Sequence, residues 1–92
     1  MTRLIIKKLL WDEWNIEHIS KHSVTKVEVE TAVLKLLGHK KGNKGRYILI
    51  GRCGTRLLSI IVNRKGTGVY YVVTARDAAK KERRRIYEKE KN

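Results

Sequence analysis

The 92-residue chain contains no proline, no phenylalanine and a single cysteine. Because one thiol cannot form an internal disulfide, we expect a reducing compartment, the cytoplasm, with Cys53 as a small half-buried residue. No apolar run approaches the roughly 20 residues that a membrane-spanning helix needs, and the N-terminus lacks a signal-peptide pattern. The sequence therefore argues against a disulfide-bonded secreted protein and against an integral membrane protein.

Acidic residues are also scarce. Nine Asp and Glu face 22 Lys and Arg, which gives a formal net charge of +13 at pH 7. A field of this size attracts polyanions, so RNA, DNA, an acidic protein and an anionic surface all fit, and a ribosome-bound protein would share it. The hydrophobic fraction of 41% is enough for a small core, and a chain of this length is expected to form one domain over residues 1–92.

Two adjacent helices are expected in the first half of the chain. Asp12 can cap a helix that ends near Lys21, because its carboxylate can accept backbone N–H groups of the first turn. Thr25 and Glu28 form a capping box for a second helix that ends near Leu37. The segment 39–45, HKKGNKG, reads as a flexible basic loop.

Strand patterns account for most of the remaining chain. Apolar segments bounded by turn residues predict strands at 3–10, 46–52, 57–64 and 69–75. Asp77 can cap a last helix that continues to about Glu88. The resulting order, β-α-α-β-β-β-α, is typical of an α+β fold in which helices pack on an antiparallel sheet.

Arginines end several of the predicted strands. Period-two alternation places Arg76 on one strand face with Tyr70, Val72 and Thr74, and Arg52 likewise ends an apolar strand face. A guanidinium suits phosphate because its planar fork donates two parallel hydrogen bonds. The alternative is that such residues simply extend from strand ends into solvent.

The last helix is densely basic. After Arg76 come five further cations before Tyr87: Lys80, Lys81, Arg83, Arg84 and Arg85. Tyr87 lies four residues after Arg83, so the two share a helix face, where they could stack a base or transfer a proton. A solvated basic helix with Tyr87 in the core is the alternative reading.

His18 and His22 lie one helical turn apart. This spacing supplies half of a zinc site, but no HExxH motif or cysteine cluster completes it, so we expect no metal. His22 is a better candidate for positioning a phosphate or transferring a proton. A histidine at a helix end can equally interact with the helix dipole.

Three segments together resemble the BrnT toxins in the right order: LLWDEWNIEHISKHSV, RYILIGRCGTRLLSIIV and YYVVTARDAAKKERRRIYE. The last is the most specific, since A-R-x-A is followed by E-R-x-x-Y-E in that family. The resemblance implies a compact RelE-like fold and the toxin of a bacterial type II toxin–antitoxin system. We therefore expect a metal-independent endoribonuclease that uses no cofactor, cleaves single-stranded mRNA and thereby inhibits translation and growth. Its implied partner is a ribbon-helix-helix antitoxin, through which alone the complex contacts operator DNA.

The resemblance also implies a set of site residues: Trp11, Asp12, His22, Arg52, Arg76, Arg83 and Tyr87. We expect catalysis from Arg76, Arg83, His22, Tyr87 and Arg52, with Arg76 and Arg83 stabilising charge on the phosphorane and His22 or Tyr87 moving protons. RNA contacts are expected from Lys80, Lys81, Arg84, Arg85, Lys40, Lys41, Lys44 and Trp11. The basic loop departs from the acidic, proline-containing loop that the family often has there. The runner-up is a non-catalytic RNA- or ribosome-binding protein, whereas a membrane-surface role is disfavoured because the basic helix lacks a large apolar face.

Overall fold

The structure is a computed structural model that describes residues 4–91. The elements are, in chain order, β1 (Lys8–Leu10), α1 (Glu13–Ser20), α2 (Lys26–Leu34), β2 (Leu36–Lys41), β3 (Arg46–Cys53), β4 (Arg56–Gly66), β5 (Val69–Asp77) and α3 (Lys80–Lys91). The predicted α+β class is confirmed. The first predicted strand is shorter than expected, and its Arg3 lies outside the described residues.

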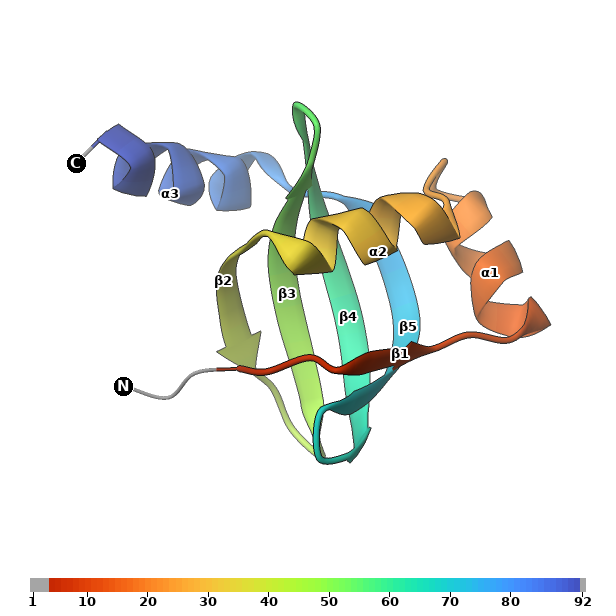
Figure 1. Cartoon of the computed structure of the whole chain (residues 1–92). Coiled ribbons are helices and arrows are strands. Elements are labelled where there is room, and N and C mark those ends of the chain that lie inside the picture. Colours follow the sequence, from red (N-terminus) through yellow and green to blue (C-terminus); the bar gives the residue numbers. More distant parts are fainter. Residues whose placement is uncertain (1–3, 92) are drawn as a thin grey trace.

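The strands form one five-stranded sheet in the order β1-β5-β4-β3-β2. Strands β2 to β5 pair antiparallel, whereas β1 runs parallel to β5, so the prediction of a wholly antiparallel sheet was wrong. The parallel pairing arises because the chain passes through α1, α2 and three strands before β5 returns beside β1. Figure 1 shows α2 crossing one face of the sheet, while α3 leaves one end of it.

The main core lies between the sheet and the helices α1 and α2. Ile19 of α1 and Val29 of α2 are fully buried against Leu49, Leu58 and other inward-facing strand residues. A second, smaller cluster lies on the opposite face, where α3 packs, and contains Ile50, Leu57, Ala78 and Ile86. Helices therefore pack through apolar side chains on both faces of the sheet, and α3 covers only part of the face on which it packs.

Two of the three predicted N-terminal caps are present, those of α1 and α2. Asp12 accepts a hydrogen bond from the Asn15 N–H at 2.9 Å, and the Asn15 side chain returns one to the Asp12 N–H. Thr25 and Glu28 form the expected capping box at the start of α2. These local bonds satisfy N–H groups that have no partner within the helix, so both helices begin where the sequence predicted.

Three predictions about the bounds of elements were wrong: the basic loop, the end of α2 and the start of α3. Residues 36–41 form the edge strand β2, and α2 ends at Leu34 instead of near Leu37. Asp77 does not cap α3, because it ends β5 and pairs with Arg56. The Ala79 N–H instead donates to the Glu82 carboxylate at 2.7 Å, which places the helix start two residues later.

A β-bulge in β5 changes which residues share a face. Val62 pairs with Val72 and Ile61 with Thr74, which leaves Val73 without a partner on β4. Because the bulge adds one residue, the alternation reverses beyond it. Tyr70 and Val72 face the main core, whereas Arg76 lies opposite Ser59 on the α3 face. The prediction that Arg76 shares the face of Tyr70 and Val72 was therefore wrong.

Candidate functional site

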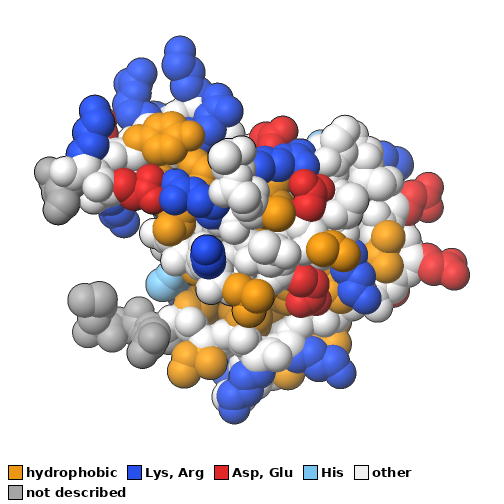
Figure 2. All heavy atoms as spheres, turned by 45° about the horizontal axis from the view of Figure 1, so that its top comes forward, with side chains coloured by type: hydrophobic (Ala, Val, Ile, Leu, Met, Phe, Trp, Pro, Cys, Tyr) orange, Lys and Arg blue, Asp and Glu red, His pale blue; other side chains and the backbone are white. Residues whose placement is uncertain are grey.

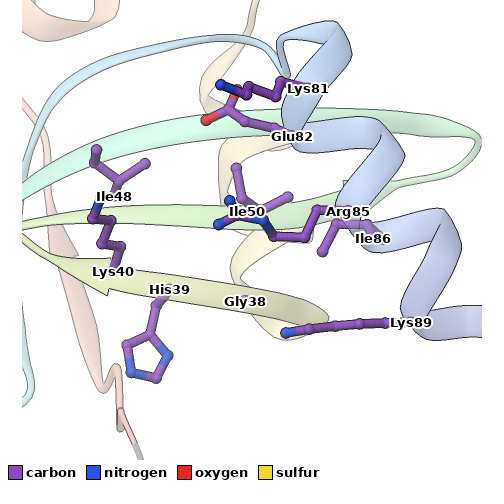
Figure 3. A pocket seen from close by; sticks show the side chains of 10 residues that line it. All are labelled: Gly38, His39, Lys40, Ile48, Ile50, Lys81, Glu82, Arg85, Ile86 and Lys89. Carbon is purple, nitrogen blue, oxygen red and sulfur yellow. The ribbon is translucent and has the colours of Figure 1, made fainter.

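A groove of about 270 Å³ lies between α3 and the part of the sheet that the helix leaves uncovered. Its lining comes from β2, β3 and α3: Gly38, His39, Lys40, Ile48, Ile50, Lys81, Glu82, Arg85, Ile86 and Lys89. Figure 3 shows Lys40, Arg85 and Lys89 extending over the floor formed by Ile48 and Ile50, whereas the His39 ring points away from α3. The groove thus combines an apolar floor with a cationic rim.

The charge of the groove is strongly one-sided. Four cationic side chains line it, Lys40, Lys81, Arg85 and Lys89, against the one carboxylate of Glu82. Figure 2 shows Lys and Arg side chains gathered around the helix at the C-terminal end of the chain. Cations close together in a concave surface raise the local concentration of anions. Phosphate groups and carboxylates are the anions that lysine and arginine side chains bind.

Glu82, which lines the groove, is contacted by Arg76 from β5. The Glu82 carboxylate accepts from the Ala79 N–H at 2.7 Å, from the Ser59 hydroxyl at 3.3 Å and from Arg76 at 3.5 Å. The Arg76 guanidinium also donates to the Asp77 carbonyl at 3.0 Å. The Arg76 side chain is 44% exposed, so its remaining N–H groups are free to meet an anion in solvent.

A second hollow, of about 350 Å³, lies on the other flank of α3. It is lined by Lys80, Arg83, Arg84, Tyr87, Glu88 and Lys91. Arg83 and Tyr87 lie together there, as their four-residue spacing predicts, and Tyr87 is 48% exposed instead of buried in the core. The expected catalytic arginines are therefore divided, with Arg76 on the groove flank of α3 and Arg83 on the opposite flank.

Arg52 is held by an ion pair with α3. Its two terminal nitrogens contact both oxygens of Glu90, at 2.7 and 2.8 Å. The hydrogen bond with Glu90 raises the pKa of Arg52, and the same bond lowers the pKa of Glu90. The pair ties the end of β3 to the last turns of the helix. Arg52 therefore has a fixed partner that any anion binding to its guanidinium would have to displace.

Trp11 and His22 lie outside both hollows. Trp11 packs beside the main core and donates from its indole nitrogen to Glu30 at 2.7 Å, with the Lys26 ammonium 6.0 Å from its ring. His22 follows the end of α1, and its ring meets His18 edge-on at 5.9 Å. The structure therefore does not bring these two predicted residues together with Arg76.

The predicted RNA contacts divide in the same way. Lys40, Lys81 and Arg85 line the groove, and Lys80 and Arg84 line the opposite flank of α3. Lys41 and Lys44 are exposed beyond the end of the groove lining, with Lys44 in the turn that follows β2. Lys89, which sequence reasoning did not select, belongs to the groove because it lies one turn beyond Arg85 on the same helix flank.

Arg56 is a further residue that sequence reasoning missed. It donates to Asp77 at 2.6 Å, to Glu28 at 2.8 Å and to the Ser23 carbonyl at 2.9 Å. These bonds connect the β3–β4 hairpin to α2 and to the end of β5. Its bond with Asp77 is the main cause of the lowered pKa of Asp77. In the sequence, Arg56 is only an arginine beside a turn, and this position does not indicate which residues it contacts.

Metal-ligating residues do not cluster in the described part of the chain: residues 4–91 contain no group of three or more His, Cys, Asp or Glu placed to hold an ion. No helix within residues 4–91 has the length and apolarity needed to cross a membrane. The chemistry that the described site can offer directly is cationic binding of phosphate, hydrogen bonding, and proton transfer by a carboxylate or a phenol.

No protein-family model matches the chain, and no curated protein matches it by sequence. Its fold is similar to the 1.1 Å crystal structure of the Brucella abortus ribonuclease toxin BrnT, with a TM-score of 0.60 and 24% sequence identity. The match covers 83% of this chain and 96% of that one. The resemblance noted in the sequence is thus confirmed at the level of the fold.

Proposed function

We propose that this chain is the toxin of a bacterial type II toxin–antitoxin system and acts as a metal-independent endoribonuclease in the cytoplasm. The observation that carries the proposal is the cationic groove beside α3, whose lining residue Glu82 contacts the exposed Arg76. The fold shared with a structure described as a ribonuclease toxin supports the same reading. A cognate ribbon-helix-helix antitoxin would neutralise the toxin and would supply all contacts to operator DNA.

Single-stranded RNA is the proposed substrate, in the form of mRNA. The rim cations Lys40, Arg85 and Lys89 would hold successive phosphates, while the floor of Ile48 and Ile50 offers an apolar surface to an unstacked base. Binding that releases counterions from the RNA weakens with salt, by a factor that grows with the number of phosphates contacted. We therefore expect RNA affinity to fall steeply between low and physiological salt.

The proposed reaction is attack of a ribose 2′-hydroxyl on its own adjacent phosphate. It breaks the bond to the 5′ oxygen and leaves a 2′,3′-cyclic phosphate and a 5′-hydroxyl. Charge on the phosphorane grows during this step, and Arg76 is the exposed guanidinium placed to stabilise it. Arg83 and Tyr87 would contact the strand where it passes to the other flank of α3.

The direct test is incubation of the purified chain with a single-stranded RNA in a buffer that contains a metal chelator. We expect cleavage with 2′,3′-cyclic phosphate ends, and no cleavage of the same sequence carrying 2′-O-methyl groups. Arg76→Ala should lower the cleavage rate at least about 100-fold, because removal of one charge-stabilising donor has effects of that size. Arg46→Ala is the matched control, since Arg46 is an exposed arginine of β3 outside the groove.

Intact RNA after incubation with folded protein would contradict the endonuclease proposal. If that protein still bound RNA, the non-catalytic RNA- or ribosome-binding reading would replace it. The toxin reading has its own test, which is induced expression in bacteria with and without the gene that neighbours this one. Growth arrest that the neighbouring gene relieves is the expected result, and normal growth of cells expressing active protein alone would refute the toxin role.

A further inference from the structure

Glu82 is the one carboxylate among the described residues that line the groove, and it is held in place from three sides. The Ala79 N–H and Arg76 both contact Oε1, and the Ser59 hydroxyl contacts Oε2. Ser59 is almost fully buried, and the Glu82 side chain is 27% exposed. A carboxylate has about four acceptor positions, so a fixed Glu82 keeps room for one further donor from the groove.

We propose that Glu82 is the general base of the RNA cleavage, taking the proton of the attacking 2′-hydroxyl. This inference rests on the proposed ribonuclease function and adds to it the group that moves the proton. The neighbour of Glu82 is the guanidinium of Arg76, at 3.5 Å. A base and a charge stabiliser are therefore adjacent, as a single phosphoryl-transfer step requires.

The step balances as follows. The 2′-hydroxyl gives its proton to the Glu82 carboxylate while its oxygen forms the new bond to phosphorus. The bond from phosphorus to the 5′ oxygen breaks, and that oxygen takes a proton from water. Glu82 then returns its proton to solvent, so the enzyme ends the cycle unchanged and no oxidant or metal takes part in the balance.

Other described proton acceptors are less well placed for this role. Asp77 is bound to Arg56, and Glu28 caps α2 and also binds Arg56. The ring of His39 points away from the groove, and Tyr87 lies on the opposite flank of α3. The charged groups that face Glu82 are cations, Arg76 from β5 with Lys81 and Arg85 from α3 and Lys40 from β2. These cations also draw the phosphate toward the base.

Glu82→Gln is the appropriate variant because its amide oxygen can still accept the Ala79 N–H while its basicity is lost. We expect kcat to fall at least about 100-fold, the usual lower bound for removal of a general base, with RNA affinity unchanged or slightly higher. The decrease of kcat/KM at low pH that we expect for the wild type should be absent from the variant. Glu17→Gln removes the same charge from an exposed position of α1, outside both hollows, and should leave rate and profile unchanged.

The outcomes separate this inference from the function on which it rests. The role of Glu82 alone is overturned if the wild type is active and the Glu82→Gln variant is fully active. It is also overturned if the rate of the variant still decreases at low pH as in the wild type. Wild-type protein that binds RNA without cutting it overturns the ribonuclease function and the role of Glu82 together. If the variant melts below the assay temperature, the pH dependence of kcat/KM of the wild type provides the test. A wild-type rate that does not decrease at acidic pH contradicts a carboxylate base.

Discussion

Replacing Arg56 with methionine tests how much the bonds of Arg56 to three other parts of the chain contribute to the stability of the fold. Methionine keeps an apolar side chain of similar reach but loses the donors to Asp77, Glu28 and the Ser23 carbonyl. The Asp77 side chain is 61% exposed, and such pairs are worth only about 0.5 kcal/mol. Glu28 is 27% exposed, and loss of charged bonds to a half-buried carboxylate and a carbonyl costs roughly 1.5 kcal/mol.

The expected loss is therefore about 2 kcal/mol at pH 7, which corresponds to a fall of roughly 8–16 °C in the melting temperature of a domain of this size. Thermal unfolding followed by circular dichroism measures it. The melting temperature of Arg56→Lys should lie between those of wild type and Arg56→Met, because an ammonium keeps the charge but lacks the planar fork. An Arg56→Met variant that melts with the wild type would refute the reasoning.

The same network predicts how stability depends on pH. Bonding to Arg56 is the main cause of the lowered pKa of Asp77, whereas the Thr25 backbone N–H is the main cause of the lowered pKa of Glu28, with Arg56 second. A lowered pKa contributes stability that is present above the ordinary carboxyl range and is lost as the pH falls through the folded-state value. The difference in unfolding free energy between wild type and Arg56→Met should thus have its full size above about pH 5 and become smaller below about pH 4. A gap that stays constant down to pH 3 would contradict this account.

Two further predictions concern the close contact under α2 and the charge of the groove. Gly51→Ala should destabilise the fold by about 3 kcal/mol, measured by chemical denaturation. A Cβ at this position would collide with the Ala32 carbonyl oxygen and lie 2.8 Å from the carbonyl carbon. An unchanged denaturation midpoint would show that the contact relaxes freely. The double variant Lys40→Gln, Lys89→Gln should weaken RNA binding and reduce by about 2 the slope of log affinity against log salt concentration. Lys21→Gln, just past the end of α1, should leave this slope nearly unchanged.

Most of the fold could be predicted because its signals are local. Asp12 and the Thr25–Glu28 box satisfy their own helix starts within three residues, so sequence spacing alone reveals them. The three long strands carry continuous apolar runs between turn residues. Fold class and element order followed from these features, apart from β2 and the parallel pairing of β1.

Strand β2 could not be predicted for a physical reason. Its sequence, LLGHKK, contains no β-branched residue, and its last three side chains are exposed. Such a segment has little intrinsic preference for a strand, and its conformation comes from hydrogen bonds to β3. The capping role assigned to Asp77 failed similarly, since Arg56 lies 21 residues away in sequence and competes for the same carboxylate.

The site was harder to predict than the fold because its assembly depends on one extra residue in β5. Regular alternation would place Arg76 on the face of Tyr70 and Val72, under α1 and α2, where an unpaired guanidinium would be buried at high cost. The bulge at Val73 turns Arg76 to the other face, beside Ser59, where Glu82 can reach it. The contact between Arg76 and Glu82 thus follows from a register shift that no residue-type pattern in β5 predicts. A site on this sheet face also needs α3 to stand away from part of the strands, and the short contact through Ile50, Leu57, Ala78 and Ile86 allows that separation.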